Sequence, residues 1–65
     1  HTNFYDLVNG YRVTKAKHML GDPQFNHWNL LGIAEECGFR SKSVFNSVFK
    51  TKTGLTPSEF RNLAD

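Results

Sequence analysis

The sequence predicts a small all-α domain with one long helix followed by three shorter ones. Three observations predict this fold class. Apolar residues recur at three- and four-residue intervals, no stretch alternates apolar and polar residues as a strand does, and capping residues, glycines and prolines divide the chain into helical segments. At 65 residues, of which 38% are hydrophobic, the chain can form one small core. Its six phenylalanines, two tyrosines and one tryptophan make it too apolar for a disordered segment.

The first segment is predicted to be a long amphipathic helix over residues 3–20. Thr2 or Asn3 can cap its N-terminus, because a short polar side chain there accepts a hydrogen bond from the first turn. Gly21 is expected to end the helix as a left-handed cap, and Pro23 prevents its continuation. Seven apolar side chains share one side of this helix: Phe4, Leu7, Val8, Tyr11, Ala16, Met19 and Leu20.

A short second helix is predicted over residues 30–37, after a polar, turn-rich connection over residues 22–28. Asn29 is a good N-cap for it, and Gly38 is expected to stop it. Its inner face carries small or apolar side chains, namely Leu30, Ile33, Ala34 and Cys37.

A third helix is predicted from Lys42 to about Thr53, with Ser41 as its N-cap and Gly54 at its end. A fourth begins at the sequence Thr56-Pro57-Ser58-Glu59 and runs to about residue 63. This sequence is a capping box, in which the glutamate reaches back to the N–H of the cap residue and proline occupies the first helical position.

The connection between the second and third helices indicates a helix-turn-helix over Asn29 to Thr53. Only four residues, Gly38-Phe39-Arg40-Ser41, separate the two helices, and glycine can take the positive φ that a sharp turn needs. Ala34 is small where the two backbones must approach. Three aromatic anchors would fix the crossing angle: Phe39, Phe45 and Phe49.

The outer face of the third helix suits a DNA major groove. With Phe45, Phe49 and Lys52 facing inward, a step of about 100° per residue turns Ser43, Asn46, Ser47 and Lys50 outward, flanked by Lys42. Lysine can donate to guanine, asparagine can pair with adenine, and serine accepts several base edges. The chain carries a net charge of only +2, but four basic and no acidic residues lie between Arg40 and Ser58. A plain polar surface is the alternative interpretation.

At this point the sequence resembles a known family. The run Ile33-Ala34-Glu35-Glu36-Cys37-Gly38-Phe39, followed by Ser41, Ser43, Phe45, Phe49-Lys50, Gly54, Pro57 and Phe60-Arg61, is similar to the signature of the AraC/XylS family of bacterial transcription regulators. Upstream, Asn9-Gly10-Tyr11-Arg12-Val13 with Ala16 and Leu20 resembles the linker helix of that family. The resemblance covers nearly the whole chain.

The resemblance implies that residues 1–65 are part of an AraC-type DNA-binding domain. Residues 1–21 would be the linker helix, residues 29–53 the helix-turn-helix, and residues 56–64 a closing helix. Family members carry two helix-turn-helix units, so this chain is expected to be a fragment that lacks the first unit and the sensor domain of a longer regulator. Its implied function is sequence-specific binding of duplex DNA, with the recognition helix of residues 42–53 in the major groove.

The resemblance also implies the contact residues. Base contacts are expected from Lys42, Ser43, Asn46 and Ser47. Phosphate contacts are expected from Arg40, Ser41 and Lys50, and from backbone N–H groups near Asn29. Arg12 resembles the arginine of the family's linker helix, where it is either structural or a contact to the DNA backbone. Ser47 departs from the arginine often seen at its place, so one strong contact is expected to be missing.

The main alternative is a protein-interaction module or a dimerising fragment, because a linker helix without its first unit would expose an apolar face. The polar outer face of the third helix argues against an interaction groove, and RNA is disfavoured because a helix cannot enter an A-form major groove. No metal, cofactor, small-molecule ligand or enzymatic activity is expected. His18, His27 and Cys37 match no zinc-ligand spacing. The single cysteine suits the cytoplasm, although the parent protein could be anchored in a membrane.

Overall fold

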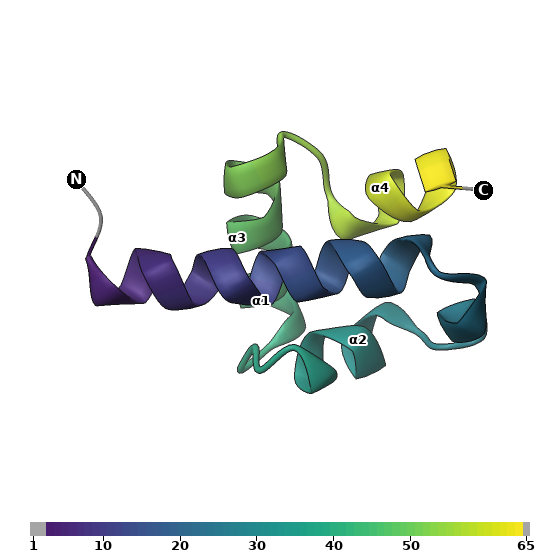
Figure 1. Ribbon diagram of the computed structural model, residues 1–65, viewed down its shortest axis with the longest axis horizontal. Coiled ribbons are helices and arrows are strands. Elements are labelled where there is room, and N and C mark those ends of the chain that lie inside the picture. Colours follow the sequence, from purple (N-terminus) through teal and green to yellow (C-terminus); the bar gives the residue numbers. More distant parts are fainter. Residues whose placement is uncertain (1–2, 65) are drawn as a thin grey trace.

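Helix α1 (Phe4–Gly21) forms the axis of the molecule, and the other elements pack along it (Figure 1). The computed structural model describes residues 3–64, so residues 1, 2 and 65 of the expected domain lie outside the described part. After α1 come the one-turn 3-10 helix η1 (Pro23–Phe25), α2 (Leu30–Glu36), α3 (Lys42–Thr53) and α4 (Pro57–Ala64). Residues 3–64 contain no strand, which confirms the all-α prediction.

The start of α1 agrees with the sequence, but its end does not. The Asn3 side chain accepts a hydrogen bond from the backbone N–H of Asp6 at 2.8 Å, whereas Thr2, the other candidate cap, lies outside the described residues. The prediction that Gly21 is a left-handed cap is wrong, because Gly21 is the last helical residue and its φ is not positive. Asp22 ends the helix in an extended conformation, which the following Pro23 favours. Its carboxylate then caps η1, an element that the sequence did not predict.

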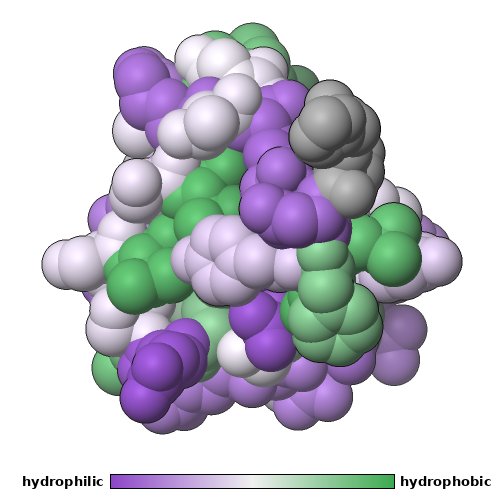
Figure 2. All heavy atoms as spheres, turned by 90° about the vertical axis from the view of Figure 1, so that its left-hand side faces the viewer, coloured by the Kyte–Doolittle hydropathy of each residue, from purple (hydrophilic) through white to green (hydrophobic). Residues whose placement is uncertain are grey.

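The buried side of α1 also differs from the predicted one. Of the seven predicted apolar residues, only Ala16, Met19 and Leu20 are buried, and Val13 and the polar Asn9 join them. Phe4, Leu7 and Tyr11 are 80%, 50% and 71% exposed, and Val8 is half-buried. The N-terminal turns of α1 extend past the other helices (Figure 1), which leaves Phe4, Leu7 and Tyr11 exposed. Seen from that end, hydrophobic side chains lie in separate groups between hydrophilic ones (Figure 2).

The core lies between α1, α2 and α3. Its members are Val13, Ala16, Met19, Leu20, Ile33, Ala34, Cys37, Phe39, Phe45 and Phe49. The predicted aromatic anchors form a continuous row: the ring centroids of Phe39 and Phe45 are 5.0 Å apart, and those of Phe45 and Phe49 are 5.7 Å apart. Phe60 of α4 extends the row, at 5.5 Å from Phe49. Such edge-on and tilted contacts suit the charge distribution of aromatic rings, so the row stabilises one mutual placement of these elements.

The caps of the three shorter α-helices confirm the predicted boundaries to within one residue. The Asn29 side chain accepts from the N–H of Gly32 at 2.7 Å, and the Ser41 hydroxyl oxygen accepts from that of Val44 at 3.1 Å. Thr56 and Glu59 form both hydrogen bonds of the predicted capping box. Gly38 and Gly54 have φ values of 93° and 84°, as expected for glycines that end helices.

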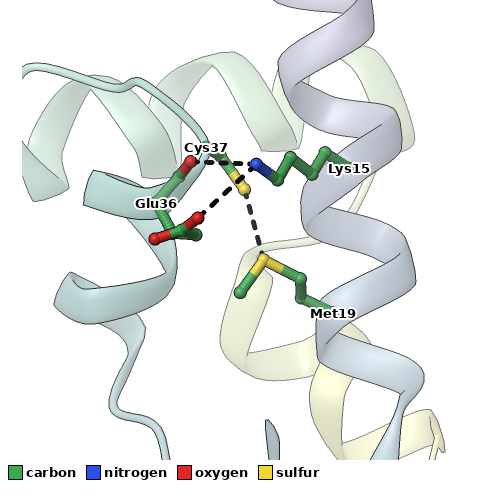
Figure 3. Close-up of polar contacts among 4 residues, drawn as sticks. All are labelled: Lys15, Met19, Glu36 and Cys37. Atoms are coloured by element: carbon green, nitrogen blue, oxygen red, sulfur yellow. Dashed lines mark hydrogen bonds and ion pairs between the residues drawn. The ribbon is translucent and has the colours of Figure 1, made fainter.

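Two contacts fasten α1 to α2 at the edge of the core (Figure 3). The Lys15 ammonium donates to the backbone oxygen of Glu36 at 3.3 Å and lies 3.7 Å from its carboxylate. The ion pair is half exposed and therefore contributes little to stability. Beneath it, the buried Cys37 thiol lies 3.8 Å from the sulfur of Met19, which confirms that Cys37 faces the core. Burial raises the pKa of this thiol; Lys15 lowers it by less, and Glu36 adds a small further rise.

A short connection carries the chain from α1 to α2. Phe25 and Trp28 pack edge to face with their ring centroids 5.3 Å apart, and both lie against the core. The Arg61 guanidinium of α4 donates to the backbone oxygen of Phe25 at 3.1 Å, which ties the last helix to η1. Trp28 is therefore a packing residue of this connection.

None of the helices within residues 3–64 combines the length and the hydropathy that a membrane crossing requires.

Candidate nucleic-acid interface

Helix α3 has one deeply buried face and one polar face. Phe45 and Phe49 are fully buried, so the opposite face of the helix must point to solvent. Four of the residues predicted to face outward or to flank that face are exposed, and Asn46 is half-buried between them; the exposed ones are Lys42, Ser43, Ser47 and Lys50. The burial of the phenylalanines therefore fixes which residues this helix offers to a partner.

The prediction that Lys52 faces inward is wrong, because Lys52 is exposed. Lys52 and Asp6 both line the small hollows between α3 and the first turns of α1. Thr53 is the half-buried residue of this last turn, and its hydroxyl donates to the backbone oxygen of Phe49 at 2.8 Å. A threonine satisfies its hydroxyl within the helix, whereas a buried ammonium without a partner would be costly.

The polar face of α3 is hollowed. A shallow hollow of about 450 Å³ lies along it, lined by Ser43, Asn46, Ser47, Lys50, Thr51 and Thr56. These side chains are short hydroxyls and an amide, apart from one lysine, so the surface can approach the edge of another molecule closely. The sequence did not place Thr51 or Thr56 on this surface, although it identified Thr56 as a capping residue. Thr51 follows Ser47 by four residues and could have been found from helical spacing, whereas Thr56 depends on how α4 packs.

Positive charge lies in and near this hollow. Lys50 lines it, Lys42 is exposed in the first turn of α3, and Arg40 is exposed in the turn before that helix. Lys50 also acts on the carboxylate of Glu59, whose pKa lies below its ordinary value. The main cause is the hydrogen bond from the backbone N–H of Thr56, followed by the Thr56 side chain, and Lys50 contributes less. The hollow therefore presents hydroxyl and amide groups beside a lysine, on a helix whose start carries further exposed cations, and such groups suit base edges and phosphates.

The two predicted phosphate-contact residues at helix starts are engaged as caps. The side-chain oxygens of Asn29 and Ser41 each accept a backbone N–H of their own helix, and both residues are exposed. Ser41 keeps its hydroxyl hydrogen free to donate. Their contacts to DNA stay predictions.

Arg12 lies apart from the exposed basic residues. It is half-buried on α1, its guanidinium donates to the side-chain oxygen of Asn9 at 3.2 Å, and its central carbon lies 5.9 Å from the ring centroid of Phe39. Of the two interpretations that the sequence left open, this environment favours a structural role.

The remaining candidates do not assemble into a site. Within the described part of the chain, no three His, Cys, Asp or Glu side chains lie together as a metal ion would require. A second hollow, of about 460 Å³, lies between α1, η1 and α2, and it contains none of the residues expected to contact DNA.

Helices α2 and α3, joined by a turn that contains Gly38, have the arrangement of a helix-turn-helix motif. The sequence profile of the family described as "Helix-turn-helix domain" matches residues 1–63. This chain belongs to that family, as an AraC-type helix-turn-helix domain. Domains of this kind bind DNA sequence-specifically in transcription regulators, with the second helix of the motif in the major groove. The family is one of regulators and not of enzymes.

Curated relatives support the same assignment. The helix-turn-helix domain is 38% identical over 52 residues to the HTH-type transcriptional activator RhaR of Escherichia coli strain K12. The identity is the same to the RhaR proteins of Escherichia coli O6:K15:H31 strain 536 and Shigella flexneri serotype 5b strain 8401. The match covers 80% of this chain and 17% of each relative, so the chain spans about a sixth of the length of the curated relatives it matches. No solved structure matches the chain.

Proposed function

We propose that this helix-turn-helix domain binds duplex DNA sequence-specifically as part of a longer transcription regulator, with α3 lying in the major groove. The observation that carries the proposal is the division of α3 between its two faces. Phe45 and Phe49 are fully buried, while the opposite face presents a polar hollow lined in part by Lys50, and Lys42 is exposed in the first turn. The motif places such a helix against base edges.

The proposed contacts follow from the positions along α3. Base edges are read by Lys42, Ser43, Asn46 and Ser47, which lie in the first half of the helix. Arg40, Ser41 and Lys50 contact phosphates at its borders, joined by the start of α2 at Asn29. Among these residues, Asn46 should contribute most to base specificity, because its amide can both donate to and accept from one base and so prefers adenine. Such a domain acts where the DNA is, in the cytoplasm of a bacterium, whether or not the parent protein is anchored in a membrane.

The division of the chain belongs to the same proposal. Helix α1 serves as the linker helix, α2 and α3 as the second helix-turn-helix unit, and α4 as the closing helix. A first unit and a sensor domain belong to the rest of the parent protein. The length of the relatives supports this, since the match occupies only 17% of each.

The exposed apolar end of α1 favours a second candidate function. Phe4, Tyr5, Leu7 and Tyr11 are half to four-fifths exposed, and such a patch promotes association. This patch binds either a neighbouring unit of the parent protein or a second copy of the chain. Sedimentation equilibrium separates the two: a monomer at all concentrations favours the neighbouring unit, and a concentration-dependent dimer that the Tyr11→Glu change disrupts favours self-association.

The central proposal is tested by selecting bound duplexes from a random pool. We expect a half-site of a few base pairs to be enriched, and we expect Ser43→Ala and Asn46→Ala to change the preferred base at separate positions of it. Ser58→Ala, on the exposed side of α4, is the matched control and should enrich the wild-type half-site. A pool that stays random for the wild-type chain would contradict the proposal.

A further inference from the structure

Arg12 belongs to α1, yet its side chain reaches the turn between α2 and α3. Its guanidinium lies over the face of Phe39, with 5.9 Å between the central carbon and the ring centroid, and donates to Asn9 at 3.2 Å. It also covers Gly38: a Cβ added to this glycine would lie 3.2 Å from Nε of Arg12. The contacts with Asn9 and Phe39 thus hold the side chain across the turn, and Gly38 has no side chain that would crowd it.

The surroundings of Arg12 suit a fixed guanidinium. Asn9 is only 2% exposed, so its amide oxygen depends on a partner within the protein, and Arg12 supplies it. The planar guanidinium can lie flat on an aromatic ring and still donate in its own plane, which an ammonium cannot do. The glycine at position 38 leaves the space in which it lies. These groups fit an arginine that is held in place and not one that extends to a phosphate.

The ring that Arg12 covers is connected to the recognition helix. Phe39 packs against Phe45 with 5.0 Å between the ring centroids, and Phe45 lies on the inner face of α3. Asn46 follows Phe45 directly in the sequence. A shift of Phe39 would therefore displace the first turns of α3, which carry the proposed base-reading side chains.

We propose that Arg12 is a positioning residue, which fixes the turn and the start of α3 against α1 and so sets the specificity of base reading without contacting DNA. This inference rests on the proposed function. It separates Arg12 from Arg40, which is exposed and is proposed to contact a phosphate. A positioning residue and a phosphate contact differ in two measurable quantities, the discrimination between DNA sequences and the dependence of affinity on salt.

The test compares Arg12→Met and Arg12→Lys with Arg40→Met in the full 65-residue chain. Affinities are measured for a duplex enriched from the random pool and for a scrambled duplex of the same composition, over a range of salt concentrations and well below each melting temperature. For both Arg12 variants we expect discrimination to fall by about tenfold, as for one misplaced base contact, with the salt slope unchanged. For Arg40→Met we expect equal loss on both duplexes and a slope reduced by about one.

Lysine is the decisive replacement, because it keeps the charge of Arg12 but loses the planar group. Full rescue by Arg12→Lys would overturn the proposal, and so would a slope that falls by about one with equal losses on both duplexes. Unchanged discrimination with only a lower melting temperature would reduce Arg12 to a stabilising residue and would overturn it as well. If Arg12→Met does not fold, Arg12→Lys decides alone by the same criteria.

A coupling measurement shows whether Phe39 transmits the effect. Phe39→Leu removes the ring and should lower discrimination by itself, and adding Arg12→Met should lower it little further. If the double variant instead lost discrimination by the product of the two single losses, Phe39 would not transmit the effect of Arg12. If the wild-type chain binds no duplex selectively, the proposed function fails. In that case hydrogen exchange still tests whether Arg12 stabilises the turn. Arg12→Lys should accelerate the exchange of the N–H groups of Gly38 and Phe39, and unchanged exchange rates would show that Arg12 does not stabilise the turn.

Discussion

The hydroxyl oxygen of Thr56 accepts the backbone N–H of Glu59 at 3.1 Å, and a carboxylate oxygen of Glu59 accepts the backbone N–H of Thr56 at 2.9 Å. This reciprocal pair begins α4 at the place where Thr56 also lines the hollow on α3. Through Thr56, the charge of Glu59 therefore links the first turn of α4 to the proposed DNA-binding surface.

Glu59 should make the stability of the domain depend on pH in the acidic range. Its pKa in the folded chain lies below the ordinary value of 4.5, so the charged form is favoured by folding. The stabilisation is complete above pH 4.5 and is lost as the pH falls through the lowered pKa. Thermal melting in this range should show a decline that Glu59→Gln flattens. Ser58→Ala, next to it but outside the capping pair, should keep the wild-type profile.

Gly38 and Gly54 should differ in their tolerance of alanine. Both have positive φ, so either substitution costs about 1–2 kcal/mol of folding free energy from backbone strain. At Gly54 an added Cβ meets nothing within 4 Å, whereas at Gly38 it meets Arg12 at 3.2 Å. Gly38→Ala should therefore be the more destabilising change in chemical denaturation. Equal losses would show that Arg12 moves aside freely.

Phe45→Ala should remove about 3–5 kcal/mol of stability, because the side chain is fully buried between two other rings. That is comparable with the whole stability of a domain of this size, so the cooperative thermal transition should disappear at ordinary temperatures. Val44→Ala, at the neighbouring and partly exposed position, should change the stability by about 0.5 kcal/mol or less. A melt of Phe45→Ala like that of the wild type would contradict the packing described for α3.

Asn46→Ala should weaken binding to a selected duplex by about 1–3 kcal/mol and relax the preference at one base pair. The expected reason is the loss of an amide that can donate and accept at the same base. Affinities for the selected duplex and for its single-base variants measure the effect. Equal losses on all sequences would make Asn46 a non-specific contact.

Salt should weaken binding strongly. With about four to six phosphate contacts, the logarithm of the affinity should fall against the logarithm of the salt concentration with a slope of about −4 to −5. Fluorescence anisotropy of a labelled duplex at several salt concentrations gives this slope. A slope near zero would show that the exposed lysines and arginine do not face phosphates.

Local chemistry explains which parts of the fold could be predicted from the sequence. The caps Asn3, Asn29, Ser41 and Thr56 satisfy N–H groups within the next three residues, so their roles were predictable from the sequence alone. The buried side of α1 was not, because its partners come from elsewhere in the chain. The polar Asn9 lies on that side, and its burial depends on Arg12. An apolar pattern could not reveal it.

In the candidate site, too, features that depend on local sequence were predictable and features that depend on packing between helices were not. The polar face of α3 was predictable, since it lies opposite Phe45 and Phe49, although the contacts of its residues with DNA stay predictions. The prediction that Lys52 faces inward was wrong. In this last turn of α3 the neighbouring Thr53 is half-buried instead, and its hydroxyl donates to the backbone oxygen of Phe49. The place of Thr56 in the hollow and that of Arg12 over Phe39 depend on the packing of separate helices, which one sequence does not encode locally.

The buried thiol of Cys37 has a practical consequence. It is the only cysteine of the chain, it lies under the Lys15–Glu36 contact, and its raised pKa keeps it protonated and unreactive. Because Cys37 is 6% exposed and its sulfur contacts Met19 of α1, we expect alkylation to require that α2 moves away from α1. The rate of alkylation therefore reports, without any added label, how often this pair of helices separates, and a bound duplex that holds α2 in place should slow it.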